Sequence, residues 1–146
     1  MIGFGQCEDN CNKEKLDFSN AIYLGCVNDS DVPNGKGVLK FDGGEIRDGC
    51  WENGKMNGPG KYASADKNNI YEGNFKNDDF YGNGILTIRG ENQIDIKEGF
   101  FKSGNLFNGT ETITWSDGQI LFRTYKDAEI INEKRNTENI YDIKDI

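Results

Sequence analysis

The stretch that decides the fold is Tyr71-Glu-Gly-Asn-Phe-Lys-Asn77, in which an aromatic residue, a glycine and a second aromatic residue alternate with polar residues. Versions of the same unit begin at Tyr23, Arg47 and Lys97, so that successive copies start 24, 24 and 26 residues apart. A nearly fixed period of this length predicts a repeat array in which each unit packs against its neighbours.

Each copy has a glycine two residues after its start, an apolar residue two positions later, and then a hairpin tip and a glycine pair. The residues that define the repeats are Tyr23, Gly25, Gly35, Gly37, Gly49, Trp51, Gly58, Gly60, Tyr71, Gly73, Phe75, Gly82, Gly84, Gly99, Phe101 and Gly109. The first copy has Val27 where an aromatic is expected and one extra residue at its tip. The fourth copy has only Gly109, with Glu111 in the other glycine slot and a longer tip.

The alternation within a copy predicts β-strands with two different faces. Tyr71, Gly73 and Phe75 point to one side, and the polar residues between them point to the other. A glycine beside an aromatic residue leaves room for a ring to lie flat on the backbone of the next strand. The aromatic face therefore has to be covered by the flanking segments, by a second subunit or by a partner.

The quoted stretch at Tyr71 and the stretch from Arg47 to Gly60 resemble MORN repeats, and the resemblance extends over residues 23 to about 122. It implies an all-β fold, namely an elongated antiparallel sheet of successive β-hairpins. It also implies a scaffolding, dimerising or membrane-associated role, without catalytic residues in the repeats. The fold class is thus predicted as mainly all-β.

The chain divides into an N-terminal flank (1–22), four repeats (23–122) and a C-terminal flank (123–146). The flanks are expected to contain short helices, one between Glu8 and Phe18 and one between Asp127 and Arg135. Both would act as caps on the array.

The four cysteines are expected to be reduced. Cys26 and Cys50 occupy equivalent slots two strands apart, about 10 Å, which is beyond disulfide reach. Cys7 and Cys11 have helical spacing, which is poor for a bridge between them. Together with the lack of a secretory signal and of a long apolar run, this predicts a cytoplasmic protein.

The net charge of −8 and the absence of histidine exclude several function classes. No segment is basic, so direct binding to nucleic acid or anionic lipid lacks its usual electrostatic driving force. Without histidine, the common Ser and Cys nucleophilic triads cannot form. The run from Asn28 to Asp31 is a poor calcium loop because Lys40 takes the place of the closing acid. We therefore expect no enzyme, no cofactor and no metal.

Candidate partner-binding residues lie at the hairpin tips. Two interpretations remain open for them: a stripe that contacts a partner, or tip-to-tip packing that sets the pitch of the array. Phe100 stands out on the polar face. The candidates are Val32, Met56, Phe80, Tyr81, Phe100, Leu106 and Phe107.

The leading hypothesis is a non-catalytic module that binds another protein through a rigid glycine and aromatic sheet, with an acidic rim that steers a basic partner. A homodimer is a further expectation. The alternative is a small acidic inhibitor, of viral or phage type, that occludes a basic nucleic-acid-binding surface. A membrane-associated scaffold follows from the resemblance alone, and the acidic array argues against it.

Overall fold

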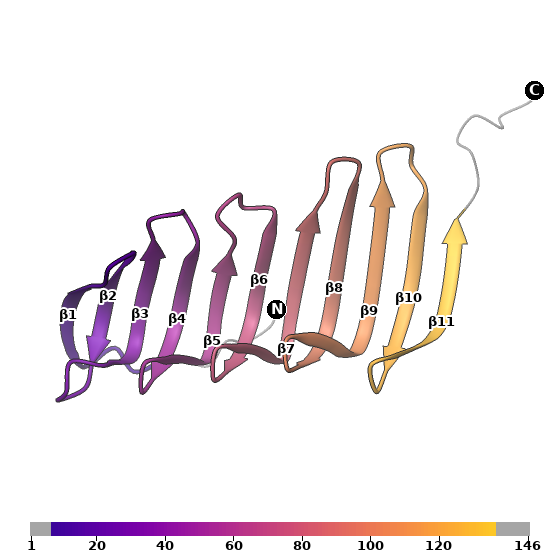
Figure 1. Cartoon of the computed structure of the whole chain (residues 1–146). Coiled ribbons are helices and arrows are strands. Elements are labelled where there is room, and N and C mark those ends of the chain that lie inside the picture. Colours follow the sequence, from indigo (N-terminus) through magenta and orange to yellow (C-terminus); the bar gives the residue numbers. More distant parts are fainter. Residues whose placement is uncertain (1–6, 137–146) are drawn as a thin grey trace, which may run out of the picture.

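The computed structural model describes residues 7–136 as a single antiparallel sheet of eleven strands in sequential order (Figure 1). Each strand pairs with the ones before and after it, so the chain forms one long row of hairpins. The strands are β1 (Asn12–Asp17), β2 (Ala21–Val27), β3 (Pro33–Phe41), β4 (Ile46–Glu52), β5 (Lys55–Ala63), β6 (Asn69–Lys76), β7 (Asp79–Arg89), β8 (Gln93–Lys102), β9 (Asn105–Trp115), β10 (Ile120–Lys126) and β11 (Glu129–Asn136). The prediction of an all-β repeat array is confirmed.

Two-residue turns close four of the five hairpins at one end of the sheet, and both residues of each of these turns have positive φ. These turns lie at residues 53–54, 77–78, 103–104 and 127–128. Positive φ at both positions is the type I′ geometry, whose twist matches that of paired strands. The last turn joins β10 to β11, so the hairpin pattern continues beyond the four copies read from the sequence.

The two faces of the sheet differ in composition. We call the face that carries Tyr23, Tyr71 and Phe101 the core face, and the opposite one the outer face. On the core face the ring of Tyr71 lies over Gly84, where a Cβ atom would collide with it, and Tyr23 lies over Gly37 in the same way. The expectation that glycines make room for rings is confirmed.

Each ring on the core face is covered by the next repeat. The rings of Tyr23 and Trp51 meet edge to face at 5.5 Å, and those of Tyr71 and Phe101 do so at 5.2 Å. As a result Tyr23, Tyr71 and Phe101 are all 0% exposed within the single chain. These rings need neither a flank helix nor a second subunit to cover them.

Both predicted helices are wrong. The segment from Glu8 to Phe18 contains β1, which pairs with β2 over six positions, and the segment from Asp127 to Arg135 lies mostly in β11. The open edges of the array offer unpaired backbone groups to any adjacent chain, and that pairing outweighs local helix preference. Both strands are mostly charged or polar, as is usual for the edge strands of a sheet, although β11 also exposes Ile130 and Ile131.

The expectation of reduced cysteines is also wrong. The structure joins Cys7 to Cys50 and Cys11 to Cys26, with Cα atoms 5.3 and 5.5 Å apart. Cys26 and Cys50 are not joined to each other, in line with their spacing. Residues 7–11 therefore lie across the outer side of β2–β4, where the carbonyl of Glu8 accepts the backbone N–H of Lys36 at 2.9 Å. Because disulfides are typical of oxidising compartments, the thiol argument for a cytoplasmic location no longer holds.

Strand pairing corrects the alignment of the fourth copy. Phe101 pairs with Leu106 as Phe75 pairs with Phe80, so the fourth tip has the same length as the third. Gly99 pairs with Gly109 as Gly73 pairs with Gly84. The return strand is one residue shorter from Leu106 to Gly109 than from Phe80 to Gly84 in the third repeat. Glu111 is therefore not in a glycine slot: it pairs with Lys97 on the core face.

In the first copy, Val27 pairs with Pro33, which confirms the extra tip residue. The position equivalent to Met56, Phe80 and Leu106 is consequently Pro33, one residue after Val32.

Candidate functional site

Three aromatic residues on the outer face form the outer aromatic patch, which we define as Tyr81, Phe100 and Phe107. The neighbours of these residues in their strands, Phe80, Phe101 and Leu106, pack on the core face, so the three rings project to the other side. All three are half-buried. The rings of Tyr81 and Phe100 meet at 5.6 Å.

Two lysines lie over rings of this patch. The Nζ atom of Lys76 is 4.9 Å from the ring centre of Tyr81, and that of Lys102 is 5.1 Å from the ring centre of Phe107. A cation over an aromatic face is attracted by the negative charge of the π-system. These contacts orient the rings while leaving part of each accessible.

The fold does not require aromatic residues at Tyr81 and Phe107. The equivalent positions in the first two repeats are Asn34 and Asn57, whose side-chain oxygens each accept a backbone N–H from the next hairpin tip at 3.2 Å. An asparagine there stabilises the stacking of tips. Tyr81 lacks the amide oxygen that makes this bond and presents a ring instead. In the fourth repeat the bond is kept, because Asn108, the residue after Phe107, accepts the backbone N–H of Asp127 at 2.9 Å.

Three of the other tip candidates, Met56, Phe80 and Leu106, belong to the core. Met56 is 1% exposed and Leu106 is 6% exposed, and Phe80 packs against the same core with its ring stacked on that of Tyr71. Val32 is half-buried at the first tip. The tip-packing interpretation therefore describes Met56, Phe80 and Leu106.

A second apolar surface lies on the outer face toward the opposite ends of β8–β10. Ile96, Thr112 and Phe122 are aligned across these three strands. Ile94 lies two residues before Ile96 in β8 and on the same face. Phe122 is 48% exposed, and Ile94 and Ile96 are about as exposed. None of these residues was a candidate from the sequence, because Ile94 and Ile96 alternate with the polar residues Asp95 and Lys97 and so have the pattern of a buried face.

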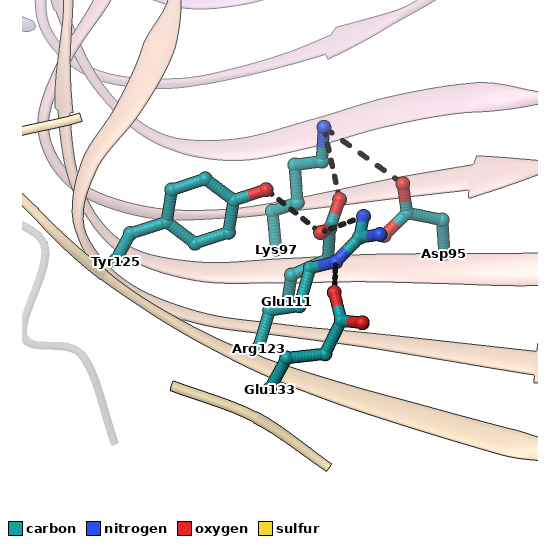
Figure 2. Close-up of polar contacts among 6 residues, drawn as sticks. All are labelled: Asp95, Lys97, Glu111, Arg123, Tyr125 and Glu133. Atoms are coloured by element: carbon teal, nitrogen blue, oxygen red, sulfur yellow. Dashed lines mark hydrogen bonds and ion pairs between the residues drawn. The ribbon is translucent and has the colours of Figure 1, made fainter. Parts of the chain in front are cut away.

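A charged network takes the place of the aromatic core at the C-terminal end of the core face (Figure 2). Lys97 and Glu111 stand where the third repeat has the apolar pair Tyr71 and Leu86. The Nζ atom of Lys97 lies 3.3 Å from a Glu111 carboxylate oxygen, and Arg123 binds the other oxygen at 3.2 Å.

The network extends to three further residues. Tyr125 donates its hydroxyl to Glu111 at 2.9 Å, and Glu133 on the edge strand accepts from Arg123 at 2.7 Å. Asp95 lies 3.8 Å from Lys97, and its Oδ1 atom is buried with no hydrogen-bond partner. Sequence reasoning missed this cluster. The sequence feature that could have indicated the cluster is Lys97, a charged residue at a repeat position that is aromatic in two other copies.

The two buried carboxyl groups respond oppositely to this environment. Burial, together with the neighbouring Glu111 carboxylate, raises the pKa of Asp95 to about 6. The pKa of Glu111 is lowered because bonds from Tyr125, Arg123 and Lys97 outweigh its burial. Since every charged group of the cluster except Asp95 is well paired, the cluster is suited to holding the last strands together.

An apolar pocket opens at the other end of the core face, beside the first hairpin tip. Its volume is about 280 Å³. The lining residues are Phe18, Tyr23, Asp31, Val32, Pro33, Leu39, Trp51 and Gly54. Most of the lining is apolar, with a single carboxylate at the rim.

Within residues 7–136, no group of three or more cysteine, aspartate or glutamate residues is arranged to hold a metal ion. In the same part of the chain, the structure contains no helix that could cross a bilayer.

The family model for the MORN repeat matches three segments, residues 30–46, 48–68 and 71–89. No curated protein matches the chain. The matched segments coincide with the hairpins of β3–β7, and the neighbouring strands continue the same sheet. MORN repeats serve as binding modules for proteins and membranes and are generally non-catalytic. Over these three segments the chain is similar to MORN repeats, and its sheet of successive hairpins is consistent with that similarity.

Proposed function

We propose that this chain is a non-catalytic module that binds another protein, and that the outer aromatic patch is the contact surface. The observation that carries the proposal is the grouping of three half-buried rings, Tyr81, Phe100 and Phe107, on the outer face, where the first two repeats have Asn34 and Asn57 at the positions of Tyr81 and Phe107. The fold does not need a ring at these positions, since the first two repeats form the same hairpins without one.

The chemistry of the patch suits protein recognition. Tyrosine and phenylalanine bury large areas with little loss of side-chain freedom, and aromatic anchors are enriched among the residues that dominate binding energy. The rings are held on a rigid sheet by their lysine contacts and by the Tyr81–Phe100 pair. Such preorganisation lowers the entropy lost on binding.

Acidic residues on the outer face suggest the character of the partner. Glu72 and Glu98 are exposed and aligned on either side of Ile85, and Glu98 lies two residues from Phe100 in β8. With a net charge of −8, the module would steer a partner that carries a basic surface. Since the core of the contact is aromatic, raising the salt concentration should slow association while changing the affinity only modestly.

Steep loss of affinity with salt would instead favour the acidic-inhibitor alternative, in which charge supplies most of the binding energy.

A second copy of the chain is one partner that the proposal includes. Its contact would be the outer patch, because the rings of the core face are already covered.

Affinity capture from the native cell tests the proposal. The wild-type chain, a Phe100→Ser/Phe107→Ser variant and a Phe122→Ser control are used as baits. Phe122 is a matched control because it is an exposed ring on the same face but outside the patch. We expect the wild type and the control to capture the same protein and the double variant to lose it. Equal capture by all three baits would refute the assignment of the patch.

A further inference from the structure

The second apolar surface is accessible to a further segment or molecule. Of its residues, Phe122 is 48% exposed, Ile94 is 42% exposed and Ile96 is 40% exposed. They belong to two rows of aligned outer-face positions that cross β7–β11. The rows are Arg89, Ile94, Thr114, Ile120 and Asn136, and Thr87, Ile96, Thr112, Phe122 and Lys134. Grouped exposed apolar residues of this kind are typical of a docking site.

A basic residue flanks this surface on each side. Arg89 in β7 and Lys134 in β11 lie at opposite ends of the two rows. Both side chains are exposed, and neither has an ion-pair partner among residues 7–136. The acidic residues at this end of the sheet, Glu91 and Asp117, lie in the turns beyond the rows. These charges favour an occupant that is apolar in its middle and acidic toward its ends.

The chain itself supplies a segment of this composition. Asn136, the last residue that the structure describes, pairs with Ile120 and therefore lies in the first row. The residues that follow it, 137–146, are Thr-Glu-Asn-Ile-Tyr-Asp-Ile-Lys-Asp-Ile. The apolar residues in the middle of this segment are Ile140, Tyr141 and Ile143, and its acidic residues are Glu138, Asp142 and Asp145.

This segment is long enough to cross the surface. Adjacent strands are about 4.8 Å apart, so β8 lies about 14 Å from β11 and β7 about 19 Å from it. An extended chain advances about 3.3 Å per residue, so Tyr141 can reach about 16 Å and Asp145 about 30 Å from the end of β11. The apolar residues can therefore lie over β8–β10 while Glu138 approaches Lys134 and Asp145 approaches Arg89.

We propose that residues 137–146 fold back across the outer face and cover the second apolar surface, with Tyr141 over Ile96 and Phe122. The other end of the sheet provides a precedent within the same molecule. There residues 7–11 cross the outer side of β2–β4, and the carbonyl of Glu8 accepts the backbone N–H of Lys36 at 2.9 Å. The cover does not depend on the proposed function, because it lies outside the outer aromatic patch.

Methyl NMR of the whole chain tests this cover. With isotope-labelled isoleucine methyl groups, we expect nuclear Overhauser effects from the ring protons of Tyr141 to the methyl groups of Ile94 and Ile96. Tyr141→Ser should remove these effects and shift both methyl signals, because the ring current is lost. Asn139→Ser is the matched control in the same segment and should leave both signals unchanged. Absence of the effects in the wild type, or equal shifts in both variants, would overturn the inference.

A second copy of the chain is the competing occupant, and a mixed sample identifies it. Labelled and unlabelled chains are combined in equal amounts. A contact between copies would give nuclear Overhauser effects between the two isotopic forms, whereas cover within one chain gives none. Effects between the two forms would therefore refute the cover by the chain's own segment.

Charge variants test the path of the segment. Arg89→Gln and Lys134→Gln should each lower the docking equilibrium constant about two- to fivefold, because each removes one exposed ion pair. The methyl shifts of Ile94 and Ile96 report the docked fraction. Lys126→Gln is the control, since this lysine is exposed in β10 at the far, hairpin-tip end of the strand. It should leave the docked fraction unchanged.

Equal weakening by all three charge variants, or by none, would contradict the proposed path. A Phe100→Ser/Phe107→Ser variant should retain the cover. That variant separates failure of the cover from failure of the outer aromatic patch.

Discussion

The indole N–H of Trp51 donates to the backbone carbonyl of Gly37 at 2.9 Å, so that the aromatic residue of one repeat is fixed to the glycine of the repeat before it. The ring of Trp51 also packs edge to face on Tyr23. This relationship joins successive repeats through both an apolar contact and a hydrogen bond.

Replacing Trp51 with alanine should therefore lower the free energy of unfolding by about 3 to 5 kcal/mol, because the ring is 5% exposed and its loss leaves a cavity. Trp51→Phe should cost less, since it keeps most of the apolar contact and loses mainly the hydrogen bond. Chemical denaturation monitored by circular dichroism measures both. A loss below about 1 kcal/mol for Trp51→Ala would contradict the packing described here.

Gly84→Ala should be strongly destabilising, by about 2 to 4 kcal/mol, because the added methyl group would collide with the ring of Tyr71. Gly43→Ala is the matched control: its Cβ would have no atom within 4 Å and its φ is not positive. Thermal unfolding of the two variants should show a large decrease in Tm for the first and almost none for the second. Equal behaviour would mean that the ring does not lie on the glycine.

Reduction of the disulfides should destabilise the N-terminal repeats. Bridges that span 43 and 15 residues contribute about 4 and 3 kcal/mol in the chain-entropy model, and the two effects are not expected to add fully. We expect a lower Tm with a reducing agent and no thiol alkylation without one. Cys7→Ser/Cys50→Ser and Cys11→Ser/Cys26→Ser separate the two bridges. Full alkylation of the native, unreduced protein would contradict the pairing.

The repeat pattern was sufficient to predict most of the fold. Glycine and aromatic residues at fixed spacing encode local contacts between adjacent strands, so the hairpins, their faces and the stacking of rings on glycines follow from sequence alone. The segments 12–17 and 129–136 were predicted as helices because they lack the glycine and aromatic pattern of the repeats, and only pairing with the edge of a neighbouring strand makes them extended.

Other features depended on contacts that are distant in sequence. The Cys7–Cys50 and Cys11–Cys26 bridges require residues 7–11 to fold back over the outer face. No local sequence pattern predicts this path of the chain. Tyr81 and Phe107 could be named as candidates from the sequence, and so could Asn57 at the equivalent position, but the hydrogen bonds by which Asn34 and Asn57 join adjacent tips depend on the structure. The pairing of Lys97 with Glu111 likewise emerged only from the strand register.

Asp95→Asn should stabilise the protein at pH 7, by about 1 to 3 kcal/mol, because it removes a buried carboxylate with an unpaired oxygen. Lys97, Glu111 and Arg123 are the charged groups near it. Its pKa is raised from 3.8 to about 6, so between these values the folded state holds the proton more tightly than the unfolded state. This group therefore makes the free energy of unfolding fall as the pH rises from about 4 to 6.

Glu111, whose pKa is lowered from 4.5, contributes stability that is present above that value and is lost as the pH falls through its folded pKa. Because Asp95 is charged at pH 7 and mostly protonated at pH 4, the increase in the free energy of unfolding from Asp95→Asn should be larger at pH 7 than at pH 4. Urea denaturation at both values measures it. An equal increase in the free energy of unfolding at both pH values, or a decrease at pH 7, would contradict the raised pKa of Asp95.

Site-specific photo-crosslinking tests whether the outer aromatic patch contacts a partner protein. A photoreactive phenylalanine analogue is placed at Phe107, and in a separate control at Phe122, which is exposed on the same face but outside the patch. Irradiation in the native cell should give one discrete cross-linked species from position 107 and none from position 122. No adduct at position 107, or adducts of equal yield at both positions, would contradict the claim.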